Sequence, residues 1–272
     1  MPETLQRGTS AVVIAQAIRN DICAGRLAHG RQLPSTRDLA AEWDTSVATI
    51  NRAMAILAEE GLVLNRARSS RLVNYPPPAE GSRPQVILIG GYAGSGKTEL
   101  GRILTRQTGW AILDKDTTTR PVVEAALEHL GVSPHDRESK LYLDVIRPAE
   151  YEALLSAVVE NAQCGASVIA SAPFLRELRD EVWCDRTSAW LSGLGADLRV
   201  VWVYCDAESM RSYIRRRGAA RDAYKLADWD GYLAGVDLDY QPRLPHFVID
   251  NSEGARPLQD QAAELLTKIA RS

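Results

Sequence analysis

One glycine-rich stretch has the residue types and the spacing needed to hold a nucleotide. Eight consecutive residues satisfy the pattern G-x-x-x-x-G-K-[ST]: Gly91, Tyr92, Ala93, Gly94, Ser95, Gly96, Lys97 and Thr98. Glycines let the backbone curl so that its N–H groups point at phosphate oxygens, and the following helix adds the positive end of its dipole. We expect ATP here, with Lys97 at the β- and γ-phosphates and Thr98 as a ligand of Mg²⁺. The other interpretation is a strand-to-helix turn without a ligand.

Two carboxylates follow the next apolar segment of the chain. Asp114 and Asp116 lie two residues apart, directly after residues 110–113. One carboxylate could complete the Mg²⁺ shell, and the other could accept a proton from a substrate hydroxyl. An aspartate at this place can also cap a helix or stabilise a turn, and the sequence leaves both interpretations open.

A basic segment lies in the last quarter of the chain. Arg217 and Arg221 are four residues apart and are followed by Asp222. Arginines here could close over the nucleotide and neutralise charge that develops on a transferred phosphoryl group. For the neighbouring Arg215 and Arg216 we prefer a solvated helix face, because most arginines lie at the surface.

Strands and helices must alternate to position these side chains. Short apolar runs predict strands over residues 86–89, 110–113, 166–170, 198–205 and 246–250. Helices are predicted over residues 98–108, 121–130, 149–163, 176–194, 209–218 and 257–269. This order predicts an α/β domain of the P-loop NTPase type, with a parallel five-stranded sheet and helices on both faces. Ligands of such sheets bind at the carboxyl ends of the strands, where the glycine-rich loop and the carboxylates lie.

The first 75 residues show a different pattern. Helices are predicted over residues 10–27, 36–43 and 46–60, and β-prone stretches follow at 62–65 and 71–74. Two helices with a short turn and a hairpin make an α+β winged helix, whose second paired helix enters the major groove of DNA. On that helix Thr49 and Arg52 share one face, from which Arg can pair with guanine and Thr can touch a thymine methyl group.

These patterns divide the chain into three parts. Residues 1–75 are expected to form a winged helix-turn-helix DNA-binding domain, and residues 85–272 a nucleotide-binding domain. Between them, residues 76–84 contain consecutive prolines, which predict an extended linker.

The charge of the chain is weakly acidic and unevenly distributed. The net charge is −3, which argues against a protein that coats nucleic acid. Residues 1–75 hold nine arginines, no lysine and seven acids, a net +2, so the remainder carries −5. No apolar run approaches the roughly 18 residues that cross a bilayer, and no signal-peptide pattern is visible. We therefore expect a cytoplasmic protein without membrane contact.

Residues 11–73 resemble the winged-helix domain of GntR-type transcription regulators. The matching segments are Gly25-Arg26-Leu27-Ala28-His29-Gly30-Arg31-Gln32-Leu33-Pro34-Ser35-Thr36-Arg37-Asp38-Leu39-Ala40, Ser46-Val47-Ala48-Thr49-Ile50-Asn51-Arg52-Ala53 and Leu57-Ala58-Glu59-Glu60-Gly61. The resemblance implies that a double-stranded DNA operator is bound by Arg37, Ser46, Thr49, Asn51 and Arg52. Arg66, Arg68 and Arg71 flank a wing tip that lacks the usual glycines, and they could meet phosphates or the minor groove. The resemblance also implies a homodimer or higher homo-oligomer.

The second part, residues 84–272, resembles the P-loop kinases of small molecules, which include shikimate, gluconate, chloramphenicol and zeta-toxin kinases. The matching pieces are the glycine-rich loop, Asp114-x-Asp116, Arg217-x-x-x-Arg221-Asp222 and residues 248–252. The resemblance implies that the acidic pair serves Mg²⁺, substrate and proton transfer, and that Asn251 lies near the nucleotide. The third strand is followed by no acidic residue where many P-loop proteins have one, so we expect Asp114 to take the metal role.

Two functions are consistent with this combination. The first is a transcription regulator whose DNA affinity is controlled by ATP and Mg²⁺. The alternative is a kinase that transfers the γ-phosphate of ATP to a hydroxyl of a small-molecule acceptor, with a DNA-binding domain that regulates its own gene. ATP-driven remodelling is disfavoured, because no second acidic motor motif is present.

Overall fold

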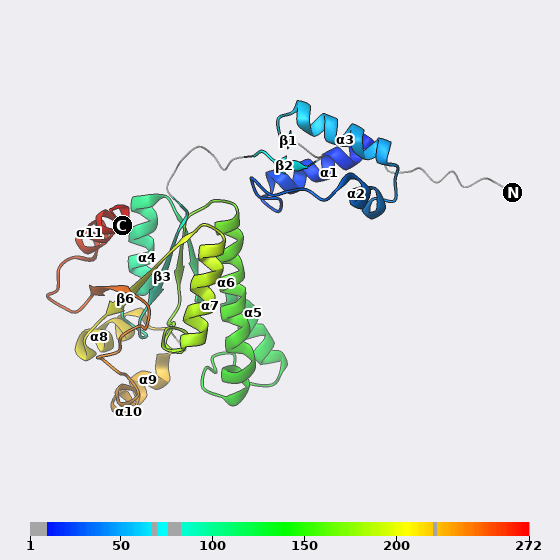
Figure 1. The fold of residues 1–272 in the computed structure, drawn as a ribbon. Helices are drawn as coiled ribbons and strands as arrows, with labels where there is room; N and C mark the ends of the chain where they lie inside the picture. Colours follow the sequence, from blue (N-terminus) through cyan, green and yellow to red (C-terminus); the bar gives the residue numbers. More distant parts are fainter. Residues whose placement is uncertain (1–9, 67–69, 76–82, 220–221, 272) are drawn as a thin grey trace. The chain divides into compact units, whose positions relative to one another are not determined.

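The chain forms two structural units, Met1–Gly81 and Ser82–Ser272, in a computed structural model (Figure 1). The residues that the structure describes are 10–66, 70–75, 83–219 and 222–271. Most of the predicted linker, and the predicted site residues Arg68 and Arg221, lie outside these described residues.

The smaller unit contains three helices and a hairpin. Its elements are α1 (Ala11–Cys23), α2 (Thr36–Glu42), α3 (Val47–Glu59), β1 (Val63–Asn65) and β2 (Arg71–Val73). Each helix begins after a serine whose hydroxyl accepts a backbone N–H bond from three residues on: Ser10, Ser35 and Ser46. Strands β1 and β2 pair antiparallel, with Leu64 opposite Leu72. The predicted winged helix is confirmed.

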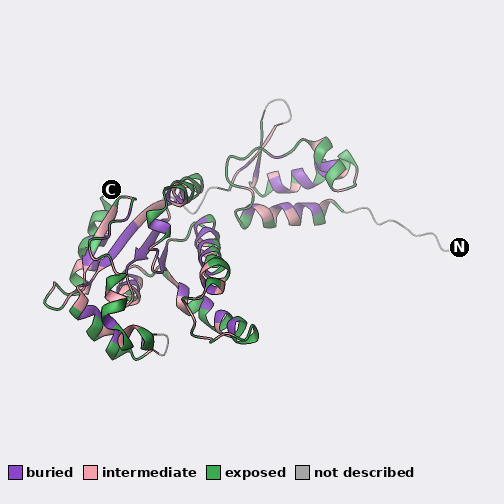
Figure 2. Cartoon of the chain, turned by 90° about the horizontal axis from the view of Figure 1, so that it is seen from below, coloured by how far each residue is buried: buried purple, intermediate pink, exposed green. Residues whose placement is uncertain are grey.

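The apolar faces of these helices form one core. Ile14 and Ile22 of α1 pack with Ile50 and Leu57 of α3, and all four side chains are fully buried. Figure 2 shows that the exposed residues of the unit lie on the outer sides of the same helices. The spacing of apolar residues along each helix therefore selects the inward face.

The larger unit is built on a five-stranded parallel sheet. Its strands are β3 (Gln85–Gly90), β4 (Ala111–Asp114), β5 (Val168–Ser171), β6 (Asp197–Tyr204) and β7 (His246–Asp250). They lie in the order β4-β5-β3-β6-β7 and all pair parallel. The five predicted strands and the predicted sheet are confirmed.

Strand β3 is buried on both faces because helices cover both sides of the sheet. Val86 and Leu88 join a core formed with α6 (Arg147–Gln163) and α7 (Glu181–Gly193). Ile87 and Ile89 point the other way, into a core with α4 (Lys97–Thr108) and α11 (Leu258–Ala270). Figure 1 shows these helix pairs on opposite sides of the sheet. A continuous apolar strand is the expected consequence.

The remaining elements surround the carboxyl edge of the sheet. They are α5 (Lys115–His129), a π-helical turn η2 (Tyr142–Ile146), a 3₁₀ turn η3 (Glu177–Arg179), α8 (Ala207–Arg217), α9 (Ala223–Ala227) and α10 (Trp229–Ala234). The sequence predicted neither the π turn nor the two short helices α9 and α10. The helix predicted over residues 176–194 is divided into η3 and α7.

Helix α5 begins earlier than the sequence predicted. A helix was predicted from Pro121, but α5 begins at Lys115 and carries Pro121 in its seventh position. The reason is the cap at Asp114, whose carboxylate accepts a bond from the Thr117 N–H at 3.1 Å. Asp116 therefore lies in the first helical turn. Among the described residues, no helix is long and apolar enough to span a membrane.

Candidate phosphate-binding cleft and DNA-binding helix

The glycine-rich loop joins β3 to α4 in a conformation that requires glycine. Gly94 and Gly96 have φ angles of +82° and +97°, in the left-handed region. A Cβ atom on Gly94 would lie 2.7 Å from Cγ1 of Ile214, and one on Gly96 would overlap the side chain of Asn251. The Asn251 amide in turn donates to the Ser95 carbonyl at 3.0 Å. Asn251 therefore lies directly beside the glycine-rich loop.

Lys97 points back over the loop. Its amine donates to the Tyr92 carbonyl at 2.7 Å, so the loop encircles a positive charge. Burial lowers the pKa of Lys97 to about 8, although the nearby carboxylates of Asp116 and Asp114 oppose this effect. The amine is thus desolvated and has no carboxylate hydrogen-bonded to it among the contacts of the described residues. An anionic ligand would relieve that cost.

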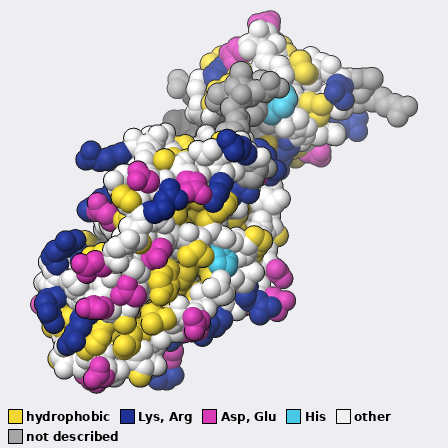
Figure 3. All heavy atoms as spheres, turned by 90° about the vertical axis from the view of Figure 1, so that its left-hand side faces the viewer, with side chains coloured by type: hydrophobic (Ala, Val, Ile, Leu, Met, Phe, Trp, Pro, Cys, Tyr) yellow, Lys and Arg dark blue, Asp and Glu magenta, His cyan; other side chains and the backbone are white. Residues whose placement is uncertain are grey.

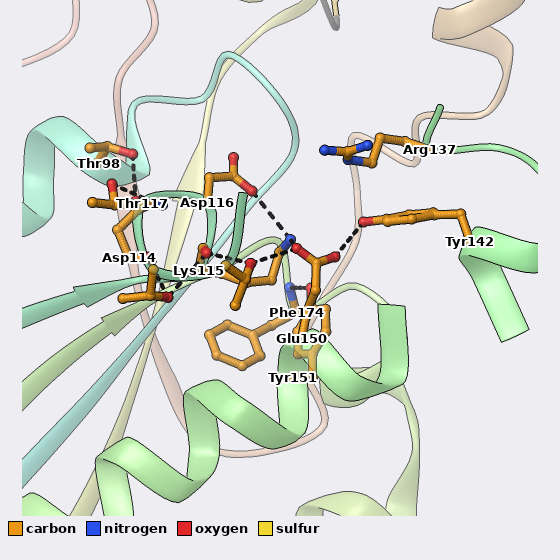
Figure 4. Close-up of polar contacts among 12 residues, drawn as sticks. Thr98, Asp114, Lys115, Asp116, Thr117, Arg137, Tyr142, Glu150, Tyr151 and Phe174 are labelled. Carbon is orange, nitrogen blue, oxygen red and sulfur yellow. Dashed lines mark hydrogen bonds and ion pairs between the residues drawn. The ribbon is translucent and has the colours of Figure 1, made fainter. Parts of the chain in front are cut away.

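Asp114 caps α5 and also contacts Thr98 at the end of the glycine-rich loop. One carboxylate oxygen caps α5, while the other accepts the Thr98 hydroxyl at 2.9 Å (Figure 4). In the sheet, Asp114 lies opposite Ser171, the last residue of β5. Strand β5 therefore has no acidic residue at this level of the sheet. A hydroxyl and a carboxylate oxygen side by side are the hard oxygen donors that Mg²⁺ prefers. The residues present therefore fit a magnesium ion.

Arg217 and Lys225 are both paired with Asp222. The Arg217 guanidinium donates to Asp222 at 3.0 Å, and the Lys225 amine donates to it at 2.8 Å. Burial alone would raise the pKa of Asp222, but the bond from Lys225 and the charges of Lys225 and Arg217 outweigh it and lower the pKa. Arg217, the last residue of α8, lines the same cleft as the glycine-rich loop.

The α9 segment reaches across to the segment that follows α5. The Tyr224 hydroxyl donates to a Glu138 carboxylate oxygen at 2.7 Å, although the two residues are 86 positions apart. Both side chains line the same cleft. The α8–α9 region and the α5 side of the sheet therefore form its two walls.

The cleft has a volume of about 1410 Å³ and contains the predicted site in one place. It is lined by the glycine-rich loop, Asp114, Asp116, Arg217 and Asn251. Its described lining residues include ten Lys and Arg and six Asp and Glu, an excess of four positive charges in a chain of net −3. By contrast, the face in Figure 3 carries both signs interspersed around a hydrophobic band. Positive charge is thus concentrated where phosphates would bind.

Comparison with known families agrees with this geometry. Residues 86–238, more than half of the chain, match the family model described as an AAA domain. The chain belongs to this family. Residues 11–73 match the model of the bacterial regulatory proteins of the gntR family, so a gntR-type DNA-binding domain precedes the kinase-like AAA domain.

Two relatives illustrate the AAA domain. A shikimate kinase of Moorella thermoacetica is 33% identical over 106 residues, which are 37% of this chain. The aligned part spans only 57% of the length of that relative. The crystal structure of a candidate kinase from Chloroflexus aurantiacus j-10-fl superposes with a TM-score of 0.51 at 17% identity, over 68% of this chain and 98% of that one. The second likeness shows that the AAA domain has the fold of that protein.

Two ion pairs of the AAA domain, one buried and one partly buried, were not predicted. The Lys115 amine contacts Glu150 at 2.8 Å. The Arg147 guanidinium donates two hydrogen bonds to the Glu177 carboxylate, at 2.7 and 3.0 Å. The two residues of the first pair are 35 positions apart in the sequence and those of the second pair 30, so no local motif links them. One signal was present: Glu150 shares a helix face with Leu154 and Val158, which are buried. A charge on an apolar face indicates a buried partner.

In the gntR domain, most predicted DNA-binding side chains are accessible. Arg37, Ser46, Asn51, Arg52 and Arg66 are exposed, and Thr49 is half-buried. The Ser46 hydroxyl is also the cap of α3. The side chains on α3 therefore present polar groups at the surface where a recognition helix needs them.

Arg71 has a second role within the gntR domain. From β2, its guanidinium donates to the Thr36 hydroxyl at 2.7 Å and to the Asn51 side-chain oxygen at 3.0 Å. These bonds tie the hairpin to the starts of α2 and α3. Arg71 and Asn51 are thus already engaged with each other, whereas Arg52 has no ion pair among the described residues.

Proposed function

We propose that this chain is a DNA-binding protein whose AAA domain transfers the γ-phosphoryl group of ATP to a hydroxyl of a small-molecule acceptor. The observation that carries this proposal is the cleft itself. Its volume of about 1410 Å³ exceeds the ~300–1,000 Å³ typical of a site for one ligand. It also joins the glycine-rich loop, a hydroxyl–carboxylate pair and a second carboxylate in one space. Room for a nucleotide and an acceptor distinguishes a kinase from a simple nucleotide sensor.

Each side chain has a proposed role. The backbone of Gly91–Thr98 would hold the phosphates, and Lys97 would balance their charge. Thr98 and Asp114 would hold Mg²⁺, which supplies charge neutralisation at the β- and γ-phosphates. Asp116 would accept the acceptor's hydroxyl proton as the new oxygen–phosphorus bond forms.

The outer residues of the cleft would act on the nucleotide. Arg217 would approach the transferred group once its partner Asp222 releases it, and Arg221 is proposed for the same role. Asn251 would stay beside the loop, where it already contacts Ser95. The kinship with a shikimate kinase over 106 residues supports a phosphoryl-transfer chemistry of this kind.

The test is acceptor-dependent release of ADP. Purified protein with ATP and Mg²⁺ is screened against sugars, polyols and hydroxy acids, and we expect at least one compound to increase turnover. Asp116→Asn should reduce the acceptor-dependent rate by roughly 10²–10⁴-fold, because the base is lost. Asp144→Asn is the matched control, since Asp144 is exposed and paired with Lys140 outside the cleft. Equal turnover in wild type and Asp116→Asn would contradict the proposal.

A second function is favoured by the gntR match and by the exposed polar face of α3. We propose that Arg37, Ser46, Thr49, Asn51, Arg52, Arg66, Arg68 and Arg71 contribute to operator binding by a homodimer, and that ATP changes its affinity. The test is binding to the DNA upstream of its own gene at fixed salt, titrated with ATP, ADP and a non-hydrolysable analogue. Operator affinity that is the same at saturating ATP and without it would refute the nucleotide control.

A further inference from the structure

A buried lysine lies directly beside the proposed base. The side chain of Lys115 is only 5% exposed, and its amine lies 3.2 Å from a carboxylate oxygen of Asp116. The same amine contacts Glu150 of α6 at 2.8 Å. Figure 4 shows the amine between the two carboxylates. One ammonium group therefore joins an acid that faces the cleft to an acid inside the domain.

Glu150 is fixed from three sides. Its first carboxylate oxygen accepts bonds from Lys115 and from the Thr119 hydroxyl, at 2.8 and 2.6 Å. Its second oxygen accepts the Tyr142 hydroxyl at 2.7 Å. The donors come from α5 and from the π turn before α6, so the carboxylate connects two elements. A buried carboxylate that accepts this many hydrogen bonds has little freedom to move.

This arrangement is more than a structural ion pair requires. Taking charges out of water is costly, and an apolar pair of similar volume often stabilises a fold equally well. Glu150 alone would complete the pairing of Lys115 inside the domain. The amine nevertheless also contacts Asp116, whose side chain is 42% exposed and lines the cleft. The buried charge is thus directed at the Asp116 carboxylate, which an acceptor in the cleft could reach.

We propose that Lys115, anchored by Glu150, is a positioning residue that holds the Asp116 carboxylate in the orientation needed to receive the acceptor's proton. This inference rests on the proposed phosphoryl transfer. Asp116 is in the first turn of α5, where its side chain has several rotamers available. The amine contact selects one of them, and misplacement of a catalytic group by about 1 Å can cost roughly 10²-fold in rate.

The experiment compares Lys115→Met with wild type and with Lys140→Met. Lys140 is a matched control because it is 91% exposed and paired with Asp144 outside the cleft. We expect kcat to fall by roughly 10²-fold in Lys115→Met, with the KM for ATP within about two-fold. Among the described residues, no hydrogen bond or ion pair joins Lys115 to the loop that would hold ATP, so nucleotide affinity should persist. A normal kcat would overturn the inference.

A double-mutant cycle separates positioning from a general structural role. If Lys115 acts through Asp116, then Lys115→Met should cost less than about three-fold in the Asp116→Asn background. An undiminished loss in that background would show that Lys115 acts elsewhere. Because Lys115→Met leaves the buried Glu150 without a cation, the cycle is repeated with Lys115→Met/Glu150→Gln, in which the amide oxygen can accept from one of the Thr119 and Tyr142 hydroxyls and the amide NH2 can donate to the other.

A crystallographic comparison tests the inference without a measurement of turnover. In wild-type crystals we expect the Asp116 carboxylate at the Lys115 amine, and in the Lys115→Met/Glu150→Gln crystals we expect it rotated or in several conformers. An unchanged, well-ordered Asp116 in the variant would overturn the inference even if no acceptor were found. Absence of acceptor-dependent turnover in wild type would instead refute the proposed function, so the two failures are distinguishable.

Discussion

Replacement of Lys97 by methionine should stabilise the nucleotide-free protein while it abolishes ATP binding. Burial lowers the pKa of the amine from 10.5 to about 8. Each pKa unit corresponds to about 1.4 kcal/mol, so the protonated amine destabilises the folded state by up to about 3 kcal/mol at pH 7. Methionine has a similar length and carries no charge. It loses the bond to the Tyr92 carbonyl, which is worth about 1 kcal/mol, so the expected net gain is about 2 kcal/mol.

The stability gained by Lys97→Met should shrink as the pH rises above about 8. Below the folded pKa of about 8 both states keep the proton, and the folded state bears the full cost. Between about 8 and 10.5 the unfolded state binds more protons, so the stability of wild type rises with pH. At pH 9.5 the cost has fallen to about 1.4 kcal/mol, and the advantage of Lys97→Met should be close to zero.

The assay is urea unfolding of nucleotide-free wild type and Lys97→Met at pH 7 and pH 9.5. Tryptophan fluorescence reports mainly on the AAA domain, because five of the six tryptophans lie there. Lys268→Met, which removes a surface ion pair with Glu264, is the control and should show no pH-dependent gain. ATP with Mg²⁺ should stabilise wild type alone. A variant that is less stable than wild type at pH 7, or a gain that does not shrink at pH 9.5, would refute the reasoning.

Three further predictions follow from the same structure. Gly94→Ala should weaken ATP binding at least about tenfold and destabilise the AAA domain by roughly 1–3 kcal/mol, measured by calorimetry, because its Cβ would strike Ile214. Asp114→Asn should raise the Mg²⁺ concentration needed for tight ATP binding by about tenfold or more, measured by titration with a fluorescent nucleotide. Arg52→Ala should weaken operator binding by about 1–3 kcal/mol in an anisotropy assay, whereas Arg19→Ala should not, because Arg19 lies on α1 and is paired with Glu60.

Each of these predictions has a clear contrary result. Normal ATP affinity in Gly94→Ala would show that the loop tolerates a side chain there. An unchanged Mg²⁺ requirement in Asp114→Asn would remove Asp114 from the proposed metal site and leave only its capping role. Equal operator affinity in Arg52→Ala and Arg19→Ala would mean that α3 does not read DNA through this side chain.

The strands and the glycine-rich loop were predictable because their signals are contiguous. Val86 to Ile89 are apolar without interruption, which only a strand covered on both faces explains. The loop pattern occupies eight adjacent residues, and its glycines prove to be those with left-handed φ angles or blocked Cβ positions. Local sequence contains all the information that these features require.

Helix boundaries near the site were less predictable. The start of α5 at Lys115 depends on the Asp114 carboxylate, which caps the helix and also receives the Thr98 hydroxyl. Pro121 suggested a later start, because proline favours the first helical turn. The π turn and the short helices α9 and α10 have too few residues for a periodic pattern.

The sequence by itself determined which residues could bind phosphate and which helix could enter DNA, because each signal lies within one short segment. Only the tertiary structure decided what surrounds them. It placed Lys115 against Glu150 and Asp116, joined Tyr224 to Glu138, and engaged Arg71 with Asn51. Apart from the neighbours Lys115 and Asp116, these partners are 20 or more positions apart in the sequence, and their distances depend on how the elements pack. A side chain's chemistry can therefore be read from the sequence, whereas its partner is set by packing.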